Sequence, residues 1–215
     1  MEYLKDYWFT EQEMAIVSKA SQKFHKMIED NKLDPYSLAG HIEELQKWGQ
    51  FALKHHPDMD PFVLFLAIFL HDAGHYPIIQ QDHAITWEII ARQFLEQEGV
   101  AQELIDKVAH CVRSHRCRDV LPQTEEAKMM ATIDSATHFT DPLFYLNVLV
   151  HPAFPKSNIL ELYDHLEAKM DRDYRDVQLY PEIQQKIEPL YTAWKELLKQ
   201  KRPNCNPKCT NIEKE

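Results

Sequence analysis

The hydrophobic positions along the chain recur at the spacing of amphipathic helices. Between residues 34 and 55, apolar side chains spaced three to five residues apart fall roughly on one face: Leu38, Ile42, Leu45, Trp48 and Leu53. Such a pattern predicts a helix with one buried side. Comparable patterns predict further helices near residues 10–30, 61–71, 82–98, 101–116, 124–138, 157–170 and 181–200, with a short segment from residue 141.

No segment shows the alternation of apolar and polar residues that is typical of a strand. We therefore expect an all-α, single-domain helical bundle of about eight or nine helices. Residues 1–202 form this domain, and the polar stretch 203–215 is expected to be a disordered tail.

Local signals predict where several of these helices begin and end. Thr10 and Glu13 have the spacing of a capping box, and Asp60-Pro61 reads as an N-cap followed by a proline in the first turn. Pro189 lies inside the last predicted helix. Because proline lacks a backbone N–H, we expect this helix to be bent or broken there.

Composition and charge indicate which kinds of molecule the chain is not expected to bind. The 215 residues carry 24 Lys+Arg against 34 Asp+Glu, a net charge of −10, which disfavours binding of long nucleic acid. The longest apolar run, Phe62–Leu70, is too short to span a membrane. The first residues do not resemble a signal peptide, so a cytoplasmic protein without a membrane partner is expected. Oligomeric state is not predicted.

One apolar helix leads directly into a histidine and an aspartate. The run "PFVLFLAIFL" ends in His71-Asp72, and an unpaired imidazole or carboxylate is costly to bury. His41 and Asp134 lie within other predicted helices. Taken singly, each has an ordinary structural explanation as a hydrogen-bonded or capping residue. Together, two imidazoles and two carboxylates suit a divalent ion: Mn, Fe, Co, Ni, Zn or Mg.

The order of these four residues resembles the HD-domain superfamily of metal-dependent phosphohydrolases. The resemblance covers about residues 38–140. It implies that His41, His71, Asp72 and Asp134 bind one divalent ion. Asp72 would also be a catalytic residue that orients the attacking water.

Two further histidines extend the resemblance. His83 stands near the start of "DHAITWEIIARQFLEQEG", and His115 in "VRSHR" fits the family pattern better than His110. In the family, such residues bind a second metal ion or contact the phosphate. The chain departs from the common His-Asp-x-Gly-Lys pattern because His75 replaces the lysine. His75 is either a second catalytic residue, able to move a proton, or a helix cap.

Other residues near the motif have less defined roles. Arg113, Arg116 and Arg118 surround His115 and could add positive charge, but for at least two of them a solvated helix end is the expected explanation. His138 fits no spacing argument.

The resemblance leads to three functional hypotheses. The first is a metal-dependent phosphohydrolase that acts on a small phosphorylated metabolite, such as a nucleotide or related phosphate ester. The second is a di-iron oxygenase of the HD fold that cleaves a C–C or C–P bond. The third is a non-catalytic ligand sensor, which the complete set of four candidate ligands disfavours.

Overall fold

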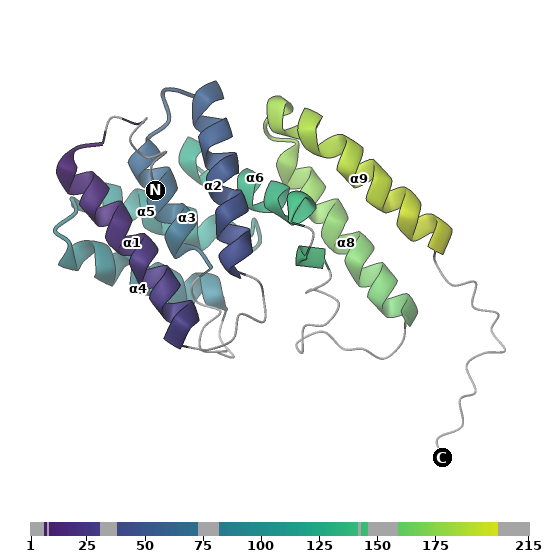
Figure 1. Ribbon diagram of the computed structural model, residues 1–215, viewed down its shortest axis with the longest axis horizontal. Coiled ribbons are helices and arrows are strands. Elements are labelled where there is room, and N and C mark those ends of the chain that lie inside the picture. The colour runs from purple at the N-terminus through teal and green to yellow at the C-terminus, as the bar shows by residue number, and fades with distance from the viewer. Residues whose placement is uncertain are drawn as a thin grey trace, which may run out of the picture.

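The computed structural model describes residues 7, 9–30, 38–72, 82–141, 143–145 and 159–201. These residues contain eight α-helices and no strand (Figure 1): α1 (Glu11–Asp30), α2 (Leu38–His55), α3 (Pro61–Leu70), α4 (His83–Gln97), α5 (Gln102–Ser114), α6 (Glu125–Thr140), α8 (Ile159–Val177) and α9 (Pro181–Lys201). The predicted all-α bundle is confirmed. The single-domain boundaries stay a prediction, and the predicted tail lies outside the described residues.

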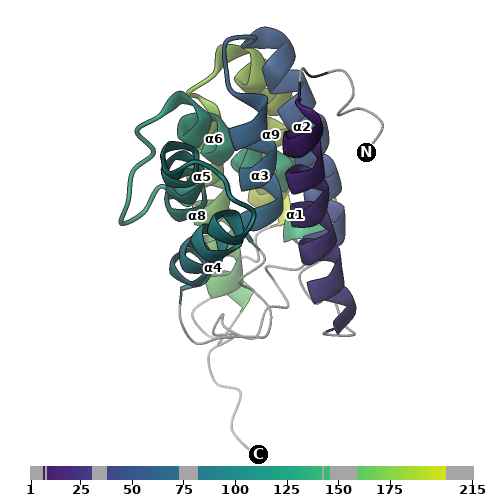
Figure 2. The ribbon, with the colours of Figure 1, turned by 90° about the vertical axis from the view of Figure 1, so that its left-hand side faces the viewer.

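The central helix is α3, which packs against α1, α2, α5 and α6. Figure 2 shows it in the middle of the bundle, with α1 on one side and α5 on the other. Nine of its ten residues are buried, which explains why its sequence is apolar on every face. Because α3 is buried up to its last residue, the residues that follow it begin in the interior of the protein. The residues that follow are His71 and Asp72.

The predicted helix starts are confirmed in atomic detail. The carboxylate of Asp60 accepts hydrogen bonds from the backbone N–H groups of Phe62 and Val63. Thr10 and Glu13 form the reciprocal capping box: the Thr10 backbone N–H donates to the Glu13 carboxylate at 2.8 Å, and the Glu13 N–H donates to the Thr10 hydroxyl at 3.1 Å.

Helix α9 continues through Pro189 as one helix, so a break at this residue is wrong, whereas the alternative of a bend stays a prediction. Proline at this position leaves the carbonyl group of Gln185 without its helical partner. Gln185 and Pro189 are both exposed, so water can hydrogen-bond this carbonyl. Helix α8 also extends beyond its predicted end, to Val177.

Helices α8 and α9 form a hairpin that packs against α6 (Figure 1). A hydrogen bond from the Thr132 hydroxyl to the backbone carbonyl of Asp176, at 3.0 Å, ties α6 to α8. This hairpin therefore lies beside the helix that carries Asp134. Within the described part of the chain, no helix is both long and apolar enough to cross a membrane.

Replacing Phe65 by alanine is expected to destabilise the fold by about 3–5 kcal/mol, because it leaves a cavity in the core beside the central helix. The Phe65 side chain is fully buried and its ring contacts those of Tyr7 and Phe9. Urea denaturation followed by circular dichroism measures the change. Ile89→Ala is the control, since Ile89 is exposed and should cost less than about 0.5 kcal/mol. Equal losses in the two variants would contradict the central role of α3.

Candidate metal centre

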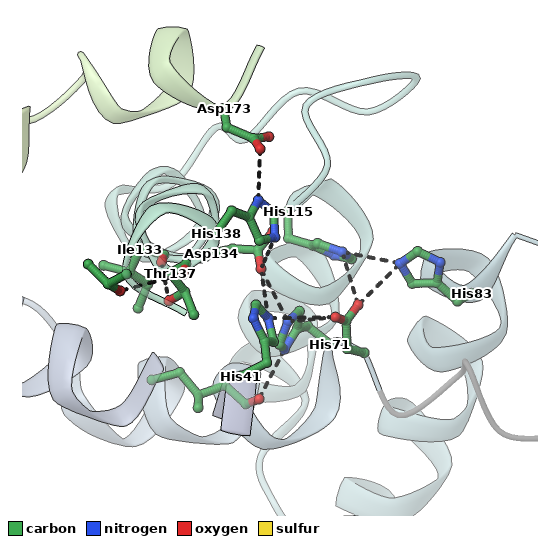
Figure 3. A network of polar contacts seen from close by, with 12 residues as sticks. His41, His71, His83, His115, Ile133, Asp134, Thr137, His138 and Asp173 are labelled. Carbon is green, nitrogen blue, oxygen red and sulfur yellow. Dashed lines mark hydrogen bonds and ion pairs between the residues drawn. The ribbon is translucent and has the colours of Figure 1, made fainter. Parts of the chain in front are cut away.

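Three separate parts of the chain bring the four motif residues together (Figure 3). His41 comes from α2, His71 and Asp72 follow α3, and Asp134 comes from α6. Nε2 of His41 lies 3.1 Å from Oδ1 of Asp134, and Nε2 of His71 lies 3.6 Å from the same oxygen. One potential ligand atom from each of the four residues lies within 4.8 Å of the others. We call these four residues the first group.

Several atoms of the first group are buried without a hydrogen bond. The exposed fraction is 1% for His41, 0% for His71 and 6% for Asp134. Among the described residues, both ring nitrogens of His41, Nε2 of His71 and Oδ1 of Asp134 have no hydrogen-bond partner. Leaving such atoms unsatisfied costs free energy, so most buried polar atoms have partners. A divalent cation would satisfy all the atoms that face the centre, and the residues therefore fit a metal ion.

The backbone orients two of the histidine rings. Nδ1 of His71 lies 3.0 Å from the carbonyl oxygen of Ile68, and Nδ1 of His115 lies 2.7 Å from that of Val112. A carbonyl oxygen only accepts, so Nδ1 carries the proton in each ring. In the neutral form of each ring, the lone pair of Nε2 then points toward the carboxylates. Metal-binding histidines commonly use their second nitrogen in this way.

A second group shares Asp72 with the first. Its Oδ1 lies 3.2 Å from Nε2 of His83 and 3.6 Å from Nε2 of His115, while Oδ2 lies 3.4 Å from Nε2 of His71. The two Nε2 atoms of His83 and His115 are 3.4 Å apart. Asp72, His83 and His115 could therefore hold a second ion, with the Asp72 carboxylate between the two positions.

Nearby charges and burial shift the pKa values of these groups. Burial alone would raise the pKa of Asp134, but the surrounding histidines, His138 foremost, lower it well below its usual range. Burial opposes a charge on His71, yet the carboxylates of Asp72 and Asp134 raise its pKa to about 10. Burial, with the nearby His71, lowers the pKa of His115 to about 3, so this ring is neutral. A cation that binds the first group takes the place of the proton on His71.

The positions of the other candidate histidines can be compared with their predicted roles. His115 belongs to the second group, whereas His110 accepts a hydrogen bond from the backbone N–H of Gln123 at 2.9 Å. The choice of His115 over His110 as a site residue stays a prediction. His75 lies outside the described residues.

Two of the three arginines near His115 are held in ion pairs. Arg113 pairs with Asp119, and Arg116 lies 2.5 Å from Asp82, the N-cap residue of α4. The second pair joins the end of α5 to the start of α4 and so keeps the two histidines of the second group near each other.

His138 lies beside the first group but was not among the predicted site residues. Nε2 of His138 lies 3.6 Å from Oδ1 of Asp134, and its Nδ1 lies 3.0 Å from Oδ2 of Asp173. Asp134 and His138 are four residues apart and so share a helix face, a spacing that the sequence-based prediction did not use. The contact with α8 had no signal in the sequence.

Comparison with known families agrees with this geometry. Residues 37–137 match the family model described as HD domain. No curated protein and no solved structure matches the chain. The matched segment runs from just before α2 into α6, and it includes every residue of both groups. The match identifies residues 37–137 as an HD domain.

Proposed function

We propose that the chain is a metal-dependent phosphohydrolase that acts on a small phosphorylated metabolite, a nucleotide or related phosphate ester. The observation that carries the proposal is the first group, in which His41, His71 and Asp134 bring together buried atoms that have no hydrogen-bond partner among the described residues. Mixed imidazole and carboxylate ligands suit Mn, Fe, Co, Ni, Zn or Mg.

The first group would hold one ion through His41, His71, Asp72 and Asp134. Such an ion supplies positive charge for a phosphoryl oxygen and lowers the pKa of a bound water. The carboxylate of Asp72, which lies between the two groups, accepts a hydrogen bond from the attacking water and orients it. His83 and His115 would either hold a second ion or contact the phosphate. His75 would move a proton to the leaving oxygen.

Charge favours a small substrate over a polymer. The chain has a net charge of −10, so its surface repels the extended phosphate backbone of a long nucleic acid. A single phosphate group needs only local positive charge, which an ion in the first group would provide.

The test is hydrolysis of a panel of phosphate esters by metal-depleted protein to which one divalent ion at a time is returned. Nucleoside monophosphates, sugar phosphates and a cyclic nucleotide cover monoesters and diesters. Ion-dependent release of phosphate, or ring opening of the cyclic nucleotide, supports the proposal. No hydrolysis by protein with a confirmed full metal content would reject it.

A di-iron oxygenase is the second candidate, and the position of Asp72 is the observation that favours it. One carboxylate between two sets of histidines is suited to two neighbouring metal ions. This candidate requires two irons per chain, an absorption change with O₂, and O₂ consumption with a substrate. Full metal content without hydrolysis or O₂ consumption would instead support a ligand sensor.

A further inference from the structure

His138 brings an additional imidazole to the carboxylate of Asp134, one helical turn further along α6. Its Nε2 lies 3.6 Å from Oδ1 of Asp134, the oxygen that also faces His41 and His71. Residues four apart on a helix share a face, so α6 itself places His138 there. His138 lies just beyond the matched residues 37–137, and the proposed function gives it no role.

The other nitrogen of the His138 ring contacts α8. Nδ1 lies 3.0 Å from Nζ of Lys169 and 3.0 Å from Oδ2 of Asp173. Lys169 and Asp173 also form an ion pair of 2.5 Å, and the Tyr145 hydroxyl donates to Oδ2 of Asp173 at 3.3 Å. Figure 3 shows the line of contacts from Asp173 through His138 to Asp134. One ring therefore connects the C-terminal hairpin to the first group.

The donors around the ring select one tautomer. Nδ1 of His138 lies equally far from the Lys169 ammonium, which can only donate, and from the Asp173 carboxylate, which can only accept. Because Asp173 already accepts hydrogen bonds from Lys169 and Tyr145, we infer that Nδ1 accepts the hydrogen bond from Lys169. The proton of the neutral ring is then on Nε2, which faces Asp134. The charge of Asp173 is met by Lys169 and by the Tyr145 hydroxyl, so Asp173 does not require a proton from the ring.

Packing holds the ring in this orientation. The ring of Phe144 stacks on that of His138, with centroids 3.6 Å apart and planes inclined by 14°. The ring of His41 lies nearly parallel to it, at 5.6 Å and 19°. His138 and Asp173 are both buried, so water does not compete for their contacts. Rotation of the ring would break the stack and the hydrogen bond from Lys169 together.

We propose that His138 is a positioning residue for Asp134 and that Lys169 sets its tautomer, so that α8 becomes part of the metal site. The Nε2–H group holds the Asp134 carboxylate toward His41 and His71. The present separation exceeds a hydrogen bond by about half an ångström, which a small rotation of the carboxylate closes. The inference rests on the proposed metal site, but it is independent of which reaction the site performs.

The first measurement uses the unsubstituted protein. Long-range ¹H–¹⁵N NMR of the histidine rings, in metal-free and Zn²⁺-loaded protein, identifies the protonated nitrogen, with a His138→Gln variant to assign the signals. We expect a proton on Nε2 of His138 and none on Nδ1. A proton on Nδ1, alone or on both nitrogens, would overturn the role of Lys169.

The second measurement is Co²⁺ affinity by absorption titration. Lys169→Met should raise the dissociation constant about tenfold or more and change the visible spectrum, because partners behind a metal ligand typically alter affinity 10- to 100-fold. Lys169→Arg keeps a donor and should remain within about threefold of the original protein. Lys195→Met is the matched control, since Lys195 also pairs with carboxylates of α8, Glu167 at 2.6 Å and Asp171 at 2.9 Å.

Different outcomes test the positioning role of His138 and the metal site separately. Unchanged Co²⁺ affinity and spectrum in Lys169→Met, even with a lower melting temperature, would show a merely structural role and overturn the inference. An equal loss of affinity in Lys195→Met would do the same. An original protein that binds no Co²⁺ would overturn the metal site itself, and the positioning role with it.

Discussion

Replacing Asp72 by alanine should remove ion binding at both groups and lower kcat/KM for phosphate-ester hydrolysis by roughly 10³-fold or more. The reason is the position of its carboxylate, with Oδ2 at 3.4 Å from Nε2 of His71 and Oδ1 at 3.2 Å from Nε2 of His83. No other described residue belongs to both groups. Metal analysis of the purified variant, beside a kinetic assay, measures both effects.

Two further variants make this result specific. His115→Ala removes a residue of the second group alone, so this variant should keep one ion per chain. His56→Ala disrupts another imidazole–carboxylate pair, in which Nε2 of His56 lies 2.6 Å from Oε1 of Glu182. This pair joins the end of α2 to α9. That variant should keep the full metal content and activity. Full metal content in Asp72→Ala would contradict the assignment of Asp72 as the shared ligand.

A bound divalent ion should raise the melting temperature by roughly 8–16 °C when its concentration is about 1,000 times its dissociation constant. Binding to the folded state alone contributes about 4 kcal/mol at this excess. For a domain of this size, each kcal/mol corresponds to about 2–4 °C. The physical source is the set of buried, unsatisfied atoms of His41, His71 and Asp134, which the ion satisfies. Differential scanning fluorimetry of metal-depleted protein, with each ion in turn, measures the shift.

The reverse experiment and a variant serve as controls. A chelator in excess should return the melting temperature to that of the metal-depleted protein. Asp72→Ala should show little shift with any ion, because both groups have lost a ligand. A shift of the same size in Asp72→Ala would place the stabilising ion elsewhere on the chain. No shift in the original protein with any of the six metals would contradict the metal site.

The sequence alone was sufficient to predict most of the helices. The capping box at Thr10, the N-cap at Asp60 and the entirely apolar α3 depend on residues within one or two turns of each other, so their patterns can be read locally. The same local reasoning could not decide between a bend and a break at Pro189. There the cost of an interrupted helix depends on whether the freed carbonyl group reaches water, and that is a property of the folded surface.

The members of the first group could be chosen from the sequence because the family resemblance supplied their order. Without that order, each residue taken singly has an ordinary structural role, and only the set of two imidazoles and two carboxylates indicates a divalent ion. His71 and Asp72 point about 100° apart on an ideal helix, so their convergence requires the chain to leave the helix. The structure ends α3 at Leu70 and brings both side chains toward Asp134.

The sequence by itself determined the helical class, the helix caps and the set of candidate ligands, since these depend on near neighbours and on residue type. Only the tertiary structure decided that the Asp72 carboxylate lies between two groups and that Lys169 contacts His138 from 31 residues away. Contacts of this kind depend on the angles and distances at which helices pack. Those quantities arise from the whole core, and no local pattern of residues encodes them.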